Sequence, residues 1–293
     1  MKVLVLGATG YIGSAVVARL TLDGHAVVPL VKDAASLYPD VPVRVGDLGD
    51  PASLRAAVTD DVDAVINLAT PTGDEAVDTA ALEALLAPLR GTGRAFVYTS
   101  GVWVLGATGN APATEDADTD PIAIVGYRAR IEQRVLAAAE DDVRAVVIRP
   151  GIVYGRDGGI PALMTGWAGE HGTGRYVGPV ATRWPMVHID DLAELYALAL
   201  NKADAGDLLH GVAWESVPVA AVAAAADIAA GGIGRAEPWP LAEAAEVLGA
   251  PFAEALALDQ VVSGRRAVDE LGWQPSRPYV LTELTSIPGG TRG

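Results

Sequence analysis

Short apolar runs alternate with stretches of helical spacing along the first half of the chain. The apolar runs predict strands at residues 2–6, 25–31, 44–46, 64–67, 95–99 and 145–149, and the spacing between them predicts helices near 11–22, 51–57, 76–89 and 125–139. Strands that alternate with helices are typical of repeated βαβ units. The pattern therefore predicts an α/β fold built on a doubly wound parallel sheet.

Three glycines follow the first predicted strand directly. Gly7 makes the tight turn out of the strand, Gly10 lets the backbone approach a pyrophosphate, and Gly13 allows the next helix to pack closely on the strand. The free N–H groups at the start of that helix then face the anion. A strand, this turn and a helix in succession predict a dinucleotide site.

Composition and charge exclude several other classes of function. The 293-residue chain carries a formal net charge of -16, which repels phosphates and anionic surfaces, so we expect no nucleic acid and no membrane as partner. It contains no cysteine, and its four histidines form no metal-ligand spacing with acidic residues, so we expect no metal site. No run has the length of a membrane span, and the N-terminal apolar stretch lacks a signal-peptide pattern. A cytoplasmic location is the expectation.

The glycine spacing is Gly-x-x-Gly-x-x-Gly. The segment GATGYIG at residues 7–13 resembles the signature of the short-chain dehydrogenase/reductase superfamily, specifically its extended, NAD-dependent epimerase/dehydratase-like branch. That branch includes sugar-nucleotide epimerases, dehydratases and reductases, and the similarity runs nearly end to end. The resemblance implies a Rossmann fold, a nicotinamide cofactor, a small-molecule substrate and a homodimer formed through helices that include the one carrying Arg128.

The regular alternation loosens after Tyr154. Residues 156–184 are rich in Gly, Pro, Trp and Met and predict a loop-and-helix segment over the carboxyl ends of the strands. The resemblance makes residues 187–189 a return toward the nucleotide domain, with Asp190 or Asp191 placed to cap a helix. We expect a dinucleotide-binding domain from residues 1–157 and 185–215, and a smaller C-terminal substrate lobe from residues 158–184 and 216–293.

The resemblance also implies the cofactor contacts. They come from the glycine turn, the ends of the predicted strands and the segment after the sixth strand, at Gly7, Thr9, Gly10, Tyr11, Ile12, Gly13, Asp47, Leu48, Ala69, Thr70, Thr99, Pro150, Gly151 and Val153. Val31 occupies the place where family members that use NAD carry Asp, and Lys32 follows it with a positive charge suited to a 2′-phosphate. We expect NADP(H) over NAD(H). The alternative is that Lys32 is a solvated surface charge and that Asp33 binds the ribose.

The catalytic residues of the family are not intact in this chain. In the family, a Ser or Thr after the fifth strand polarises the substrate oxygen, while a Tyr acts as general acid/base. A Lys four residues beyond the Tyr lowers its pKa and binds the nicotinamide ribose. Gly101 stands at the usual hydroxyl position, so Ser100 is the candidate in this chain. The alternative for Ser100 is a hydroxyl that satisfies the backbone of the turn.

Tyr127 is the tyrosine in the right region, but Ile131 stands four residues beyond it. A second register, suggested by Glu132, puts Arg128 at the lysine position and Ile124 at the tyrosine position, and we favour it. Arg128 then holds the nicotinamide ribose, although arginine does not deprotonate near neutral pH. Tyr127 is the candidate proton donor, and the alternative is a plain core or surface tyrosine.

Large apolar side chains fall in segments that should overhang the nicotinamide. They are Trp103, Met164, Trp167, Tyr176 and Trp184. They favour an apolar or aromatic substrate over a sugar nucleotide, because Arg175 and Arg183 are the clear basic candidates between residues 160 and 184. The alternative is that these side chains form the core of the lobe. His188 is expected to be a core histidine on a structural strand, with a catalytic acid as the alternative.

Three hypotheses about function follow. The leading one is an NADP(H)-dependent oxidoreductase that transfers hydride to or from a small organic carbonyl, imine or alcohol, with Ser100, Tyr127 and Arg128 at its site. The second is a sensor or scaffold that keeps its cofactor without turnover. The third is a non-redox isomerase or cyclase on the same fold.

Overall fold

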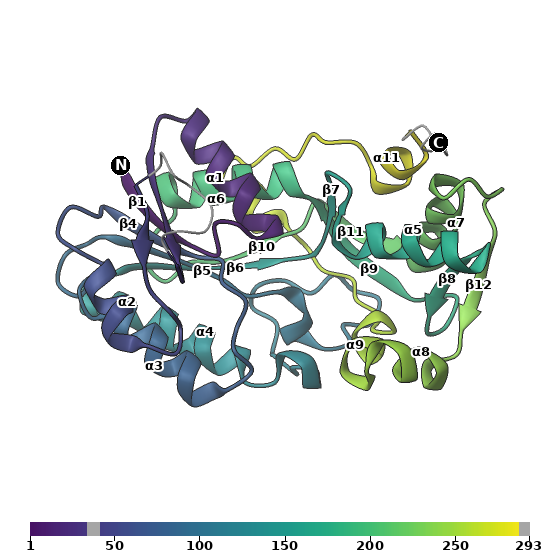
Figure 1. The fold of residues 1–293 in the computed structure, drawn as a ribbon, viewed down its shortest axis with the longest axis horizontal. Helices are drawn as coiled ribbons and strands as arrows, with labels where there is room; N and C mark the ends of the chain where they lie inside the picture. The colour runs from purple at the N-terminus through teal and green to yellow at the C-terminus, as the bar shows by residue number, and fades with distance from the viewer. Residues whose placement is uncertain (34–41, 287–293) are drawn as a thin grey trace.

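A seven-stranded parallel sheet forms one half of the molecule (Figure 1). The computed structural model describes residues 1–33 and 42–286. The strand order is β10-β6-β5-β4-β1-β2-β3, with every pair parallel. The strands are β1 (Lys2–Leu6), β2 (Ala26–Val31), β3 (Arg44–Val45), β4 (Ala64–Asn67), β5 (Ala95–Thr99), β6 (Arg144–Pro150) and β10 (Leu208–Gly211).

Helices cover both faces of this sheet, as Figure 1 shows. One face carries α1 (Tyr11–Leu22) and α6 (Ile189–Lys202), and the other carries α2 (Pro51–Ala57), α3 (Glu75–Leu86) and α4 (Arg128–Ala137). Side chains alternate between the two faces along β1, where Val3 and Val5 pack with α1 and α6 and Leu4 packs in the opposite core. The doubly wound fold predicted from the sequence is confirmed.

The structure differs from the sequence prediction at one helix and one strand. The helix expected near 125–139 is interrupted, because 3₁₀ turns at Ala123–Val125 and Ala138–Asp141 flank a shorter α4. Gly126, with a backbone φ of 5°, interrupts the helical conformation between the first turn and α4. The strand β10 was not predicted, since its four residues include His210 and Gly211 and show no alternation.

The other half of the molecule is a smaller lobe with its own core. A three-stranded sheet, β11-β9-β7, adjoins the main sheet, and the pair β12-β8 lies further out. These strands are β7 (Ile152–Gly155), β8 (Gly174–Val177), β9 (Arg183–His188), β11 (Trp214–Pro218) and β12 (Ala236–Trp239). The helices of the lobe are α5 (Gly159–His171), α7 (Val219–Ala229), α8 (Leu241–Leu248), α9 (Ala250–Leu256) and α11 (Val280–Ser286), and α10 (Arg265–Leu271) packs on the main domain.

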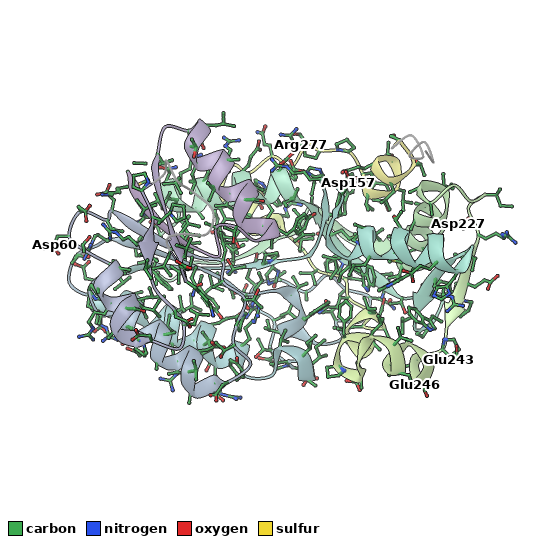
Figure 2. The ribbon with its side chains drawn as sticks, in the orientation of Figure 1. Asp60, Asp157, Asp227, Glu243, Glu246 and Arg277 are labelled. Carbon is green, nitrogen blue, oxygen red and sulfur yellow. The ribbon has the colours of Figure 1, made fainter. Side chains whose placement is uncertain are left out.

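The strand β9 joins the two cores. Trp184 lies in the core of the lobe, whereas Val187 and Ile189 lie in the core beneath α1 and α6. The predicted boundary at residue 185 therefore falls inside a strand that serves both parts. In Figure 2, Asp157 lies near β7 at the junction of the two parts, and Glu243 marks α8 at the outer end of the lobe.

Candidate functional site

The glycine turn forms a cradle that only glycine fits. Gly7 has a φ of +71°, and a Cβ there would lie 2.5 Å from the carbonyl oxygen of Leu68. A Cβ on Gly13 would lie 2.0 Å from the carbonyl oxygen of Gly7. Both positions therefore exclude a side chain, and the start of α1 is held tightly against β1 and the end of β4.

No side chain within residues 1–33 and 42–286 caps the N-terminus of α1. The helices α2 and α3 begin at Asp50 and Asp74, whose carboxylates accept hydrogen bonds from the first amides. By contrast, α1 begins at Gly10, with no side-chain cap and no acidic residue in its first turn. Free amides and a positive helix end suit an anion, so this terminus fits the pyrophosphate of a dinucleotide.

A groove of about 600 Å³ runs from this turn along the ends of β1, β2 and β4. Seven of the predicted cofactor residues line it, namely Gly7, Thr9, Gly10, Lys32, Leu48, Ala69 and Thr70. Gly13 lies behind the turn as packing. Asn67 holds the backbone at Ala69, which lines the groove, because its Oδ1 accepts from the amide of Ala69 at 3.1 Å.

Lys32 and Asp47 form an ion pair at the adenosine end of this groove. The Nζ atom of Lys32 lies 3.0 Å from Oδ2 of Asp47, and the lysine side chain is 78% exposed. The backbone N–H of Gly49, together with the ammonium of Lys32, lowers the pKa of Asp47. Asp33 also lines the groove, so both candidates for the adenosine ribose region, Lys32 for a 2′-phosphate and Asp33 for the ribose hydroxyls, lie at the groove.

A second hollow, of about 260 Å³, continues from the start of α1 toward the lobe, and we call it the cleft. Seven predicted residues of the cofactor and catalytic sets, including Ser100, meet there with Trp103. The lining residues are Tyr11, Ile12, Ser100, Gly101, Val102, Trp103, Val125, Arg128, Pro150, Gly151, Ile152, Val153, Gly159 and Ile160.

Tyr11 ties the glycine turn to the segment that follows β7. Its hydroxyl donates to the carbonyl oxygen of Gly155 at 2.7 Å, and burial, with the nearby charge of Glu283, raises its pKa. Its ring fills the space beside Gly158, where a Cβ would lie 2.2 Å from the Cε2 atom of the ring. One wall of the cleft is therefore fixed by the same turn that forms the phosphate cradle.

Ser100 presents a hydroxyl that the protein leaves unused. The residue is 5% exposed, its amide donates to the carbonyl of Ile148 at 2.8 Å, and its Oγ has no hydrogen-bond partner among the residues that the structure describes. The neighbouring Thr99 differs, because its hydroxyl lies 2.7 Å from that of buried Tyr196 on α6. The backbone of Ser100 is thus fixed, while its buried hydroxyl is left unpaired in a residue that lines the cleft.

Arg128 reaches the same place from the first turn of α4. Its Nη1 donates to the carbonyl oxygen of Ser100 at 3.3 Å. One turn further along α4, buried Glu132 holds α4 on the sheet through Arg149, with Oε2 and Nη2 2.6 Å apart. The structure therefore brings Ser100 and Arg128 together.

Arg149 also contacts His210, which lies fully buried on β10. Nδ1 of His210 donates to the carbonyl of Ser263 at 3.0 Å, and Nε2 accepts from Nη1 of Arg149 at 3.5 Å. Burial and then the charge of Arg149 lower the pKa of His210 to about 3. This histidine is therefore neutral.

Tyr127 lies outside the cleft, which corrects the expectation that it stands beside Ser100. Its hydroxyl donates to Oδ2 of Asp78 on α3 and accepts from the amide of Gly73 at 3.2 Å. Burial and this carboxylate raise the pKa of Tyr127 to about 12. A hydroxyl that is already donated to a carboxylate elsewhere is not positioned to protonate a substrate beside Ser100.

Four of the five predicted substrate residues belong to the core of the lobe. Trp103 lines the cleft, whereas Met164, Trp167, Tyr176 and Trp184 pack in the lobe core, which corrects the expectation for these four. The basic candidates are also engaged elsewhere. Arg183 pairs with Asp259 at 2.6 Å, and Arg175 stacks on Trp239 with its guanidinium carbon 5.4 Å from the ring centre.

His188 is a structural residue rather than part of the cleft. Its Nδ1 accepts from the amide of Asp190 at 3.0 Å, so His188 caps α6. The expectation that Asp190 or Asp191 caps this helix is therefore wrong. Asp191 instead accepts from the amides of Ser276 and Arg277.

Sequence reasoning missed much of the apolar lining of the cleft. Val102, Val125, Ile152 and Ile160 contribute to it. Helical spacing does not relate Val125 to Arg128, because Gly126 separates the 3₁₀ turn that carries Val125 from α4. Among residues 1–33 and 42–286, no cluster of three potential metal ligands occurs, and no helix is both long and apolar enough to traverse a bilayer.

Comparison with known proteins identifies relatives over the whole chain. Residues 3–210 match the model of the NAD dependent epimerase/dehydratase family. An uncharacterised protein of Schizosaccharomyces pombe is 33% identical over 98% of this chain and 99% of its own length. The 2-alkyl-3-oxoalkanoate reductase of Stenotrophomonas maltophilia is 28% identical over 73% of this chain and 69% of that protein.

A solved structure agrees with these matches. The crystal structure of human epimerase family protein SDR39U1 with NADPH is 28% identical, with a TM-score of 0.76 over 98% of this chain and 99% of that one. These findings confirm the resemblance to the extended short-chain dehydrogenase/reductases, which bind nicotinamide cofactors. The chain therefore belongs to the NAD-dependent epimerase/dehydratase family.

Proposed function

We propose that the protein is an NADP(H)-dependent oxidoreductase that transfers hydride to or from a small organic carbonyl, imine or alcohol. The observation that carries the proposal is the buried, unpartnered hydroxyl of Ser100 in the cleft beside the glycine turn. A hydroxyl there donates a hydrogen bond to the reacting oxygen or nitrogen as charge develops on it. The S. maltophilia relative is named as a reductase of an oxo compound, which supports carbonyl chemistry.

Different residues of the site bind the cofactor and polarise the substrate. The free amides of α1 hold the pyrophosphate, and the backbone at Pro150, Gly151 and Val153 flanks the nicotinamide, which supplies the hydride when bound. Ser100 polarises the acceptor. Because Tyr11 already donates its hydroxyl hydrogen to Gly155, we propose that the proton completing a reduction comes from water.

The preference for NADP(H) rests on Lys32. Its side chain is largely exposed at the rim of the groove, and the ion pair with Asp47 holds its ammonium beside the predicted adenosine position. A 2′-phosphate would draw this ammonium because phosphate carries more charge than one carboxylate. The human relative solved with NADPH supports the same choice.

Fluorescence titration with NADPH and NADH tests the cofactor proposal. We expect NADPH to bind more tightly, and K32Q to weaken NADPH by roughly tenfold, the loss of one charge-assisted contact, with little effect on NADH. R55Q removes an exposed positive charge from α2 outside the groove lining and serves as control. Equal affinity of the unaltered protein for NADPH and NADH would contradict the argument from Lys32.

Loss of NADPH absorbance in the presence of ketones, imines and enones tests turnover. S100A should lower kcat by about 100-fold, as loss of one donor at a developing charge does. Y127F deletes a hydroxyl outside the cleft and should leave kcat unchanged. Tight NADPH binding without turnover across a broad panel would instead support the sensor hypothesis.

A further inference from the structure

The guanidinium of Arg128 is poorly satisfied by the protein around it. One of its five N–H donors reaches the carbonyl oxygen of Ser100 at 3.3 Å. Within the described part of the chain, no carboxylate lies within 4.0 Å of this guanidinium. Arg130, two residues further along α4, differs, since it pairs with Glu75 at 2.6 Å. In a chain with a formal net charge of -16, Arg128 is kept in the cleft without a counter-ion.

A second unused donor lies next to it. The Oγ atom of Ser100 is buried without a partner, and the carbonyl of the same residue is the group that Arg128 contacts. The hydroxyl and the guanidinium are therefore adjacent. A ligand with two neighbouring oxygens satisfies both, whereas a ligand with one oxygen leaves a buried donor unpaired at a cost in binding.

The remaining side chains that line the cleft are mostly apolar, and the cleft itself is small. Ile12, Trp103, Val125, Ile152 and Ile160 surround the two donors. The volume of about 260 Å³ lies near the lower end of the range for ligand pockets. The nicotinamide that we place against Pro150, Gly151 and Val153 shares this cleft, so the space left beside Trp103 and Val125 suits a short hydrocarbon chain. A sugar diphosphate does not fit, because Arg175 and Arg183 are engaged elsewhere.

We propose that the substrate is a small apolar oxo acid, whose carboxylate binds Arg128 and whose oxo group, one or two carbons away, binds Ser100. The planar fork of a guanidinium matches a carboxylate and gives it two parallel hydrogen bonds. This assignment rests on the proposed reductase function for the oxo group, but the carboxylate site is a binding site in its own right. Arg128 thereby selects the substrate, in addition to the ribose contact expected from the sequence.

Calorimetric binding of hexanoate and of 1-hexanol, a matched pair with and without the charge, tests the carboxylate site. We expect hexanoate to bind at least about tenfold more tightly than hexanol, both to the protein alone and with NADP⁺ added. R128Q should bring the two affinities together, and R128K should leave a reduced preference because the charge remains without the fork. R130Q, on the exposed side of α4, should retain the full preference.

Two results would overturn the proposal. One is an unaltered protein that binds hexanoate no better than hexanol. The other is a preference for hexanoate that survives R128Q while NADPH binding weakens, which would leave Arg128 with the ribose alone. NADPH binding is measured in a separate titration. If NADPH does not bind but the preference for hexanoate persists and depends on Arg128, the reductase function is rejected and the carboxylate site is retained.

Discussion

Acidification should weaken folding through His210. The unfolded chain protonates this histidine near its ordinary pKa of 6.5, whereas burial and Arg149 lower the folded value to about 3. Between these values the unfolded chain binds an extra proton, so the contribution to stability is present above pH 6.5 and is lost progressively as the pH falls toward 3. At about 1.36 kcal/mol per pH unit, pH 5.0 removes about 2 kcal/mol relative to pH 7.5.

Urea unfolding at pH 7.5 and pH 5.0 measures this loss, and pH 5.0 lies above the isoelectric point near 4.5. Because carboxylates also titrate, the quantity of interest is the difference between the unaltered protein and H210Q, which should shrink by about 2 kcal/mol on acidification. H171Q, which replaces an exposed histidine, is the matched control. If H210Q folds poorly, the ring resonances of His210 give the same answer in the unaltered protein. A His210 that titrates near pH 6.5 in the folded state would refute the reasoning.

Three further outcomes are expected. G13A should abolish NADPH binding and lower the melting temperature, because its Cβ would lie 2.0 Å from the carbonyl oxygen of Gly7, whereas G166A, with open space around it in α5, should not. G101S should keep its free energy of unfolding within about 0.5 kcal/mol of the original, since the nearest atom to the new Cβ is 4.0 Å away. Its kcat in the ketone assay should rise, because the new hydroxyl stands at the position that the family uses to polarise the substrate oxygen. Y127F should cost about 1 kcal/mol in urea unfolding, for the lost bonds to α3 and its loop.

The phosphate cradle was predictable because its determinants are local. Gly7, Gly10 and Gly13 act on a single turn, and the strand before it and the helix after it are visible in one continuous segment, residues 2–22. The alternation of strands and helices likewise reports buried faces that each element carries in its own sequence. Arg128 was chosen as a site residue through the register suggested by Glu132, whose ion pair with Arg149 holds α4 against the sheet.

The direction of side chains in loops was not predictable from the same signals. Tyr127 is drawn to Asp78, a residue 49 positions earlier, by a bend at Gly126 that no spacing rule reveals. Trp167 and Trp184 are residue types typical of a ligand pocket, but their partners are Trp239 on β12 and Leu256 on α9, whose placement depends on the whole lobe. Aromatic content alone does not distinguish a core from a binding wall.

The contact between Tyr11 and Gly158 has a consequence for related sequences. Because any side chain at residue 158 would overlap the tyrosine ring, the two positions constrain each other across 147 residues of chain. Relatives that replace Gly158 should carry a smaller residue after the second glycine of the turn, and those that keep a tyrosine there should keep the glycine. An alignment in which the two positions vary independently would show that the first turn of the chain and the entrance to the lobe evolve separately.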